Sequence, residues 1–222
     1  RGANAWLGWM RGGTAMAAIA GCAGFGAVCG SSLATASTMG KVALPELRRY
    51  NYSPALATGS LAAGGVLGIL IPPSVVLIGY AVMVEANIVT MFAAALLPGI
   101  LAVLLFILTI AIYVRLRPKA GPRGGVSSRD EFVAATLGLL PVMVIFGLVL
   151  GGIYTGLFNP TPAAAIGVLL VAIYGVMTRR LNGSALIAAL KSTARSSGMI
   201  YLILLGAELM KIFMSRVGLP QQ

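Results

Sequence analysis

The segment Gly68-Ile69-Leu70-Ile71-Pro72-Pro73-Ser74 lies in the middle of an apolar stretch that runs from Pro54 to Val84. Proline is poorly tolerated inside a helix, because it lacks a backbone N–H and clashes with the preceding turn. Here two prolines are adjacent, and three glycines precede them. Unwound backbone at membrane depth persists only where protein or a water-filled cavity satisfies its polar groups. The segment therefore predicts a discontinuous helix of the kind that forms the ion or substrate site of a transporter.

The composition places the chain in a membrane. Of its 222 residues 59% are hydrophobic and 9% are charged, and the mean hydropathy is +0.96, which together predict an all-α polytopic membrane protein. The net charge of +11 comes from Lys and Arg residues in short polar segments between apolar ones, so it does not indicate a nucleic-acid partner. With no histidine and only Cys22 and Cys29, neither a metal site nor a disulfide framework is expected. The chain starts at Arg1 without a signal peptide, and we expect it to be an internal part of a longer protein.

About 20 apolar residues are needed to cross roughly 30 Å of hydrocarbon. Two long apolar stretches do not fit this length. Four segments do fit, namely Met91–Val114, Phe132–Leu150, Ala163–Thr178 with its flanks, and Ser196–Met214.

The first misfit is Thr14–Leu44, which is interrupted at Gly30-Ser31-Ser32 and leaves two arms of about 15 residues or fewer, too short to span. Its many Gly and Ala residues permit close helix approach. We interpret residues 14–45 as a re-entrant helical hairpin. The alternative is a single spanning helix with a polar kink.

The second misfit is Pro54–Val84, whose 31 residues would reach about 46 Å as one helix. We expect two half-helices, about Pro54–Ala63 and Ser74–Val84, within a discontinuous element over residues 54–84. The alternative is a proline kink without function, which also occurs in membrane helices.

The charges test this arrangement, because cytoplasmic loops are rich in Lys and Arg. If the hairpin returns to its starting side, 14 of the 16 basic residues fall on one face, which we expect to be cytoplasmic. On that face we expect an interfacial arm helix at residues 1–13 with Trp6 and Trp9, a linker at residues 115–130, and an amphipathic helix at Asn182–Ala194, capped by Asn182 or Ser184. The segment 131–222 then begins a second structural half with about three transmembrane helices. The 14 residues are Arg1, Arg11, Lys41, Arg48, Arg49, Arg115, Arg117, Lys119, Arg123, Arg129, Arg179, Arg180, Lys191 and Arg195.

Both interruptions offer chemistry for ions. At a broken helix the carbonyls that end the first half face a cation, and the amides that start the second half face an anion. If the hairpin tip and the helix break meet, their carbonyls and hydroxyls form an oxygen cage for Na⁺ beside a carboxylate site. Glu208 is the only acidic residue inside a predicted span, and an ion pair with Lys211 is a simpler role for it than a proton relay. Na⁺ is therefore favoured over H⁺ as the coupling ion.

Four sequence blocks, in order and at sensible spacing, closely resemble the large membrane (permease) subunit of tripartite ATP-independent periplasmic (TRAP) transporters. The resemblance runs along essentially the whole chain. The blocks are GSSLATA at 30–36, LATGSLAAGG at 56–65, LGILIPPS at 67–74 and GIYTGLFNPT at 152–161.

This resemblance implies a Na⁺-driven symporter of the bacterial inner membrane that imports organic anions such as C4-dicarboxylates or sugar acids by an elevator motion. It also implies a periplasmic substrate-binding protein and a small membrane subunit as partners, and no cofactor other than Na⁺ as coupling ion. The chain would be an internal fragment with one half-site, because the second hairpin and second broken helix of the family are not in it. Carried over onto this sequence, the sodium and substrate site comprises Gly30, Ser31, Ser32, Thr35, Gly65, Gly68, Pro72, Pro73 and Ser74.

One departure from the family pattern concerns an acidic residue. The family commonly reads Thr-Pro-Thr-Glu-Ala-Ala where this chain has Pro162 in place of the glutamate, so any role of that carboxylate is in doubt here. The main functional alternative is a channel or passive pore built on re-entrant loops. An intramembrane enzyme is disfavoured, because the chain has no histidine and no clustered carboxylates. A purely structural scaffold would leave the polar tip and the double-proline break unexplained.

Overall fold

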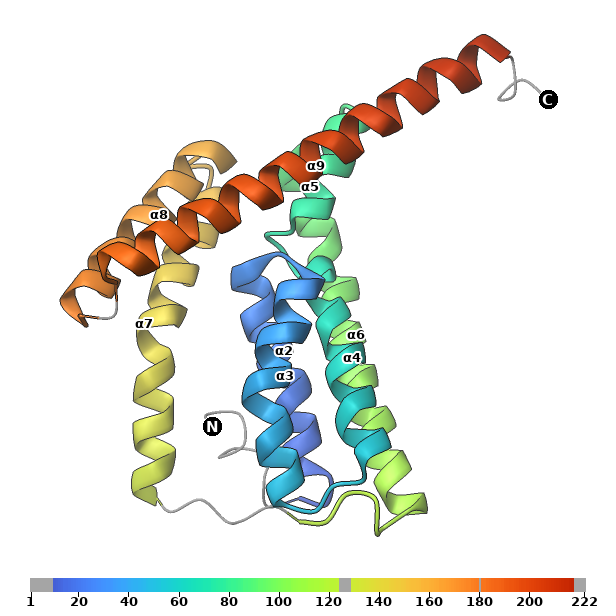
Figure 1. The fold of residues 1–222 in the computed structure, drawn as a ribbon, viewed down its shortest axis with the longest axis vertical. Coiled ribbons are helices and arrows are strands. Elements are labelled where there is room, and N and C mark those ends of the chain that lie inside the picture. Colours follow the sequence, from blue (N-terminus) through green and yellow to red (C-terminus); the bar gives the residue numbers. More distant parts are fainter. Residues whose placement is uncertain (1–9, 124–128, 180, 218–222) are drawn as a thin grey trace. The chain divides into compact units, whose positions relative to one another are not determined.

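The computed structural model describes residues 10–123, 129–179 and 181–217. Within these ranges the chain forms eight helices and no strand, which confirms the predicted all-α class (Figure 1). The predicted arm helix at residues 1–13, with both tryptophans, lies largely outside the described residues. The helices are α2 (Gly13–Cys29), α3 (Ser32–Arg49), α4 (Pro54–Leu70), α5 (Val75–Met83), α6 (Ile88–Leu116), α7 (Arg129–Tyr154), α8 (Pro160–Met177) and α9 (Gly183–Val217).

The chain divides into two compact units. The first consists of Arg1–Ile78 with Asn87–Leu148, and the second of Gly79–Ala86 with Val149–Gln222. The hairpin tip and the double-proline break both belong to the first unit.

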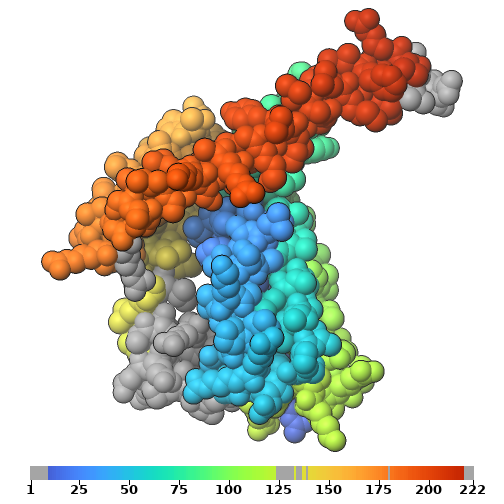
Figure 2. Space-filling view, in the orientation of Figure 1, coloured from blue at the N-terminus to red at the C-terminus, as the bar shows by residue number. Residues whose placement is uncertain are grey.

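In the first unit α2, α3, α4 and α6 pack around one apolar core, which includes the fully buried side chains of Met16, Ile19 and Leu67. The α2–α3 hairpin, in blue, and α4, in cyan, are in continuous contact in Figure 2. Small residues line this contact. At Gly64, for example, an added Cβ would lie 2.7 Å from the sulfur of Cys22. Close approach of small residues is how membrane helices gain van der Waals contact without a hydrophobic driving force.

The start of α2 and the end of α3 lie at the same end of this unit. The backbone N–H of Thr14 donates to the Tyr52 hydroxyl at 3.2 Å, and the N–H of Gly12 donates to the Gly121 carbonyl at 3.1 Å. The N–H of Ser53 donates to the carbonyl of Ala120 at 2.9 Å. Residues 14–49 therefore form a helical hairpin that returns to its starting side, and the alternative of a single kinked helix is wrong.

This end of the first unit collects basic side chains, which account for seven of the 14 that were predicted to share one face. Arg11 and Arg123 pair through a backbone bridge. Glu46 also lies at this end, 3.9 Å from Arg49 on the same helix. The basic residues here are Arg11, Arg48, Arg49, Arg115, Arg117, Lys119 and Arg123.

The hairpin arms are longer than predicted. They contain 17 and 18 residues, and the second continues through Pro45 to Arg49. Pro45 lies inside this helix and is exposed. Leu47 is fully buried and anchors the last turn in the core, which explains why the helix does not end at the proline.

The first half of the broken helix also extends beyond its predicted end at Ala63 and reaches Leu70. Gly64, Gly65 and Gly68 suggested an earlier end, since glycine weakens a helix by about 1 kcal/mol relative to alanine. All three are buried against the hairpin, so close packing compensates for their low helix propensity. The second half, Val75–Met83, agrees with the prediction to within one residue.

In the second unit, one 35-residue helix, α9, replaces the separate amphipathic helix and span that were predicted. The segment 195–198 changes in polarity but contains no proline, and nothing in it terminates a helix. The cap is Asn182, whose side-chain oxygen accepts the N–H of Ala185 at 2.8 Å. Glu208 and Lys211 form the expected ion pair, with 3.1 Å between Oε1 and Nζ.

Three helices are long and apolar enough to cross a membrane, namely α6, α8 and α9, among the residues described. The α4 and α5 pair qualifies as one broken span with a bend of 43°. Helix α7 was predicted as a fourth unbroken span. Among the residues described, its apolar segment is the shorter Leu140–Tyr154. The chain is therefore a multi-pass membrane protein.

Candidate functional site

The hairpin tip is a two-residue turn between α2 and α3. Gly30 adopts a left-handed conformation with φ of 64° and donates its N–H to the Gly26 carbonyl at 2.7 Å, which ends α2. Ser31 is extended, and its hydroxyl oxygen accepts the N–H of Ala34 at 3.4 Å, which caps α3. A glycine followed by a serine is suited to this turn, because glycine ends one helix and serine begins the next.

The helix break is a consequence of the two prolines. In an α-helix the N–H of residue i bonds to the carbonyl of residue i−4, so Pro72 and Pro73 leave the carbonyls of Gly68 and Ile69 without those bonds. The N–H of Ile71 still donates to Leu67, at 3.0 Å, and is the last bond of α4. Ser74 is fully buried, and its hydroxyl accepts the N–H of Leu77 at 3.4 Å to cap α5.

The tip and the break lie against each other. The N–H of Val75 donates to the carbonyl of Gly30 at a long 3.4 Å. A Cβ added to Gly30 would lie 2.9 Å from the carbonyl oxygen of Pro73 and 3.6 Å from Cα of Ser74. Glycine is thus required at the tip for two reasons, its positive φ and the nearness of the break.

Three other predicted site residues lie at the helix contact just beneath the tip. Thr35 is fully buried and donates its hydroxyl to the Ser31 carbonyl at 2.7 Å. A Cβ on Gly68 would lie 2.6 Å from Oγ1 of Thr35 and 2.8 Å from the Ser31 carbonyl oxygen. A Cβ on Gly65 would lie 2.7 Å from Cβ of Ala36. In this structure these residues hold α3 against α4, and Thr35 fixes one carbonyl of the tip.

Gly26 belongs to the same contact and was not among the predicted residues. A Cβ on Gly26 would lie 2.7 Å from Cα of Gly68 and 2.9 Å from its nitrogen, so the two backbones touch directly. The sequence does carry a signal, because Gly26 lies four residues before Gly30 on the small-residue face of α2. What the sequence does not state is which glycine of α4 lies opposite.

The resulting site brings together four helix ends. The C-terminal ends of α2 and α4, at Gly30 and Ile71, carry partial negative charge on their carbonyls, and the N-terminal ends of α3 and α5 carry partial positive charge on their amides. The described part of the chain contains no cluster of three or more His, Cys, Asp or Glu side chains that could hold a metal. A cation at this place would be held by carbonyl and hydroxyl oxygens, and an anion by amides and hydroxyls.

The sequence matches the family model of the Tripartite ATP-independent periplasmic transporter, DctM component, over residues 1–222. The chain belongs to this family. Its membership agrees with the resemblance in the four sequence blocks, of which the first forms the tip, the second lies within α4 and the third contains the break.

Several curated relatives of the DctM family are similar along nearly the whole chain. The C4-dicarboxylate TRAP transporter large permease protein DctM of Pseudomonas aeruginosa is 34% identical over 220 residues, which cover 99% of this chain and 51% of that protein. The sialic acid TRAP transporter large permease protein SiaM of Vibrio cholerae is 34% identical over 205 residues, 89% of this chain and 46% of that protein. The ectoine/5-hydroxyectoine TRAP transporter large permease protein UehC of Ruegeria pomeroyi is 34% identical over 207 residues, 91% of this chain and 47% of that protein. The chain spans about half the length of these relatives.

The family's fourth block forms the turn between α7 and α8 in this DctM-family chain. Gly156 has a φ of 76°, and the N–H of Phe158 donates to the Gly152 carbonyl at 3.0 Å. Helix α8 then starts at Pro160, with Pro162 in its first turn where the family commonly has glutamate. A first-turn acid normally interacts favourably with the helix dipole, and α8 lacks that interaction.

Proposed function

We propose that this chain is part of the large membrane subunit of a Na⁺-coupled transporter that imports organic anions across the bacterial inner membrane by an elevator motion. The observation that carries the proposal is the meeting of four helix ends at the tip and the break. This arrangement supplies carbonyl oxygens and amide hydrogens side by side, and residues 24–40 and 64–84, which carry it, contain no Asp, Glu, Lys or Arg. Such a site suits a cation and a carboxylate bound together.

The cation is assigned to the carbonyl side of the site. The carbonyls of Gly68 and Ile69 lack their helical partners because of the prolines, and the C-terminal end of α2 lies next to them. Na⁺ is a hard cation that binds neutral oxygens, and two helix C-termini pointing toward one place favour it further. The Ser32 hydroxyl, half-buried beside the tip, is an additional oxygen for this ion.

The carboxylate of the substrate is assigned to the N-terminal ends of α3 and α5. Free first-turn amides and a serine hydroxyl form a ready anion site at a helix N-terminus. The named substrates of two relatives, C4-dicarboxylate and sialic acid, are both carboxylates, and this shared group is the one that the site would recognise. Family membership supports the further proposal that a periplasmic binding protein delivers the substrate and that a small membrane subunit supports this chain.

The test uses the complete protein with its partner proteins in liposomes. Uptake of a radiolabelled C4-dicarboxylate should require an inward Na⁺ gradient and should saturate with substrate. Ser32→Ala should raise the Na⁺ concentration for half-maximal uptake about tenfold or more, because a hydrogen-bonding group on a charged ligand contributes about 1.5–3 kcal/mol.

Ser37→Ala is the matched control, since Ser37 is exposed on the same helix and donates to its own helix at Ala34. It should leave the Na⁺ dependence unchanged. Equal Na⁺ dependence of the Ser32→Ala variant and wild type would remove the site assignment. Non-saturating flux with single-channel currents would instead identify a passive pore.

A further inference from the structure

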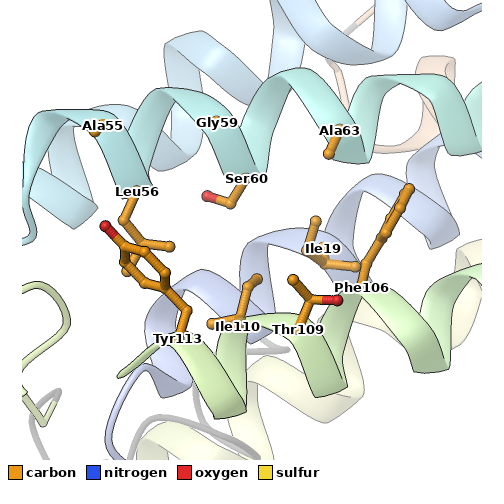
Figure 3. Close-up of a pocket in the computed structure, with 10 residues that line it drawn as sticks. All are labelled: Ile19, Ala55, Leu56, Gly59, Ser60, Ala63, Phe106, Thr109, Ile110 and Tyr113. Atoms are coloured by element: carbon orange, nitrogen blue, oxygen red, sulfur yellow. The ribbon is translucent and has the colours of Figure 1, made fainter. Parts of the chain in front are cut away.

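A groove separate from the tip and the break runs between α4 and α6 in the first unit, with Ile19 of α2 at its floor (Figure 3). Its volume is about 280 Å³, at the lower limit of pockets that enclose a whole small molecule. Ala63 and Phe106 lie at one end in Figure 3, and Leu56 and Tyr113 lie at the other. The groove therefore suits an elongated group of small cross-section.

The lining of the groove is apolar in effect. Its two aliphatic hydroxyls are already bonded within their own helices, from Ser60 to the Ala57 carbonyl at 3.1 Å and from Thr109 to the Leu105 carbonyl at 2.7 Å. The other lining groups, apart from the Tyr113 phenol, are hydrocarbon. An organic anion would lose its hydration here without gaining partners, so the groove is not a second substrate site. A hydrocarbon chain has no such cost.

The Tyr113 end of the groove opens onto the basic end of the unit. The guanidinium carbon of Arg117 lies 5.9 Å from the centre of the Tyr113 ring. The bond from the Ser53 N–H to the Ala120 carbonyl, at 2.9 Å, holds the segment after α6 against the start of α4. Arg117 therefore lies beside the Tyr113 end of the groove, and the exposed Lys119 directly precedes the bonded Ala120.

We propose that this groove binds an anionic phospholipid, with one acyl chain between α4 and α6 and the phosphate at Arg117 and Lys119. An apolar slot with a tyrosine at its mouth and two cations nearby matches the chain, the interface and the headgroup of such a lipid in order. A protein segment of the same width would satisfy the slot but would not need the cations. The proposal concerns a different place from the ion site and does not depend on the proposed function.

The experiment is photo-crosslinking in nanodiscs of the complete protein. The two probes are a phosphatidylglycerol and a phosphatidylcholine that carry the same diazirine-labelled acyl chain, and labelled peptides are identified by mass spectrometry. The phosphatidylglycerol should label the peptides that contain residues 55–63 and 106–113, and it should do so more strongly than the phosphatidylcholine. Arg117→Gln should reduce this headgroup preference about fivefold, the contribution of one basic residue at an anionic surface.

Two leucine variants test whether the chain lies in the groove. The methyl group of Ala63 points into the groove in Figure 3, so Ala63→Leu should fill it and reduce labelling several-fold. Ala62→Leu is the matched control, because Ala62 is exposed on the same helix and does not line the groove. It should leave labelling unchanged.

Three results would overturn the proposal. One is equal labelling of the groove by both lipids in the wild-type protein. Another is undiminished labelling in the Ala63→Leu variant. The third is an absence of lipid label from these peptides in a protein that melts normally, which would mean that another part of the protein covers the groove.

Discussion

The contact between Gly26 and Gly68 can be tested with one added methyl group. In the Gly26→Ala variant the new Cβ would lie 2.7 Å from Cα of Gly68 and 2.9 Å from its nitrogen. Carbon atoms in favourable contact are about 3.5–4.0 Å apart, so α2 and α4 must separate locally by about 1 Å. Both neighbouring atoms are backbone, so no side chain can rotate away to relieve the clash. Overpacking of this kind costs about 1–3 kcal/mol.

Gly24→Ala is the matched control. Gly24 lies on the same helix two residues earlier, is exposed, and would place its Cβ more than 4 Å from any neighbour. Both substitutions gain about 1 kcal/mol of helix propensity over glycine. This gain cancels in the comparison, so the Gly26→Ala variant should be less stable than the Gly24→Ala variant by about 1–3 kcal/mol.

The assay is the apparent melting temperature of the complete protein in detergent, followed by Na⁺-dependent uptake in liposomes. The Gly26→Ala variant should melt several degrees below the Gly24→Ala variant. It should also need more Na⁺ for half-maximal uptake, because Gly68 precedes the break by one turn and moves with α4. Equal melting temperatures and equal Na⁺ dependence of the two variants would refute the inference that backbone contact beneath the tip positions the site.

Three further changes probe other contacts. Tyr52→Phe removes the acceptor of the buried Thr14 N–H and should destabilise the complete protein in chemical denaturation by about 1–3 kcal/mol. Asn87→Ala removes the cap that accepts two N–H groups of α6, at 2.8 and 3.2 Å, and should cost about 1 kcal/mol in the same measurement. Glu208→Gln should preserve both the Na⁺ dependence and the pH profile of uptake, because the Glu208 carboxylate is held by Lys211 on its own helix; a shifted pH profile would indicate a proton relay instead.

The broken elements could be predicted from the sequence because their causes are local. Two adjacent prolines cannot donate helix bonds whatever surrounds them. A Gly-Ser pair is suited to ending one helix and capping the next, as Gly30-Ser31 does, but the same pair at Gly59-Ser60 lies inside α4. The α4–α5 break follows from the two prolines alone, whereas the hairpin turn also depends on the packing of the two arms. Hydropathy located α6 and α8 to within a few residues, and the Asn87 cap explains why α6 begins at Ile88, three residues before the predicted start at Met91.

The remaining features depend on contacts between distant residues. A glycine such as Gly64 reads as a helix breaker in isolation, and only its contact with Cys22 shows that it is a packing residue inside α4. The pairing of Gly26 with Gly68 has no local signal that selects one partner over another. In α9 the composition predicted a helix end that does not exist. The change from polar to apolar residues near Arg195 marks a change of surroundings and not the end of a helix.

Under the proposed function, the four helix ends account for Na⁺ coupling at a place where residues 24–40 and 64–84 supply no charged side chain. Under the proposed function, the carbonyl ends of α2 and α4 repel the carboxylate that the amide ends of α3 and α5 attract. A bound Na⁺ removes this repulsion and adds its own attraction, which for unit charges about 4 Å apart is about 4 kcal/mol at an effective dielectric constant of 20. Because linkage is reciprocal, the carboxylate raises the affinity for Na⁺ by the same factor. Under this proposal neither ligand binds well alone. Symport requires this mutual dependence, so that the carrier is either empty or loaded with both ligands. A fixed aspartate or glutamate at this place would hold Na⁺ without the substrate and would weaken the coupling.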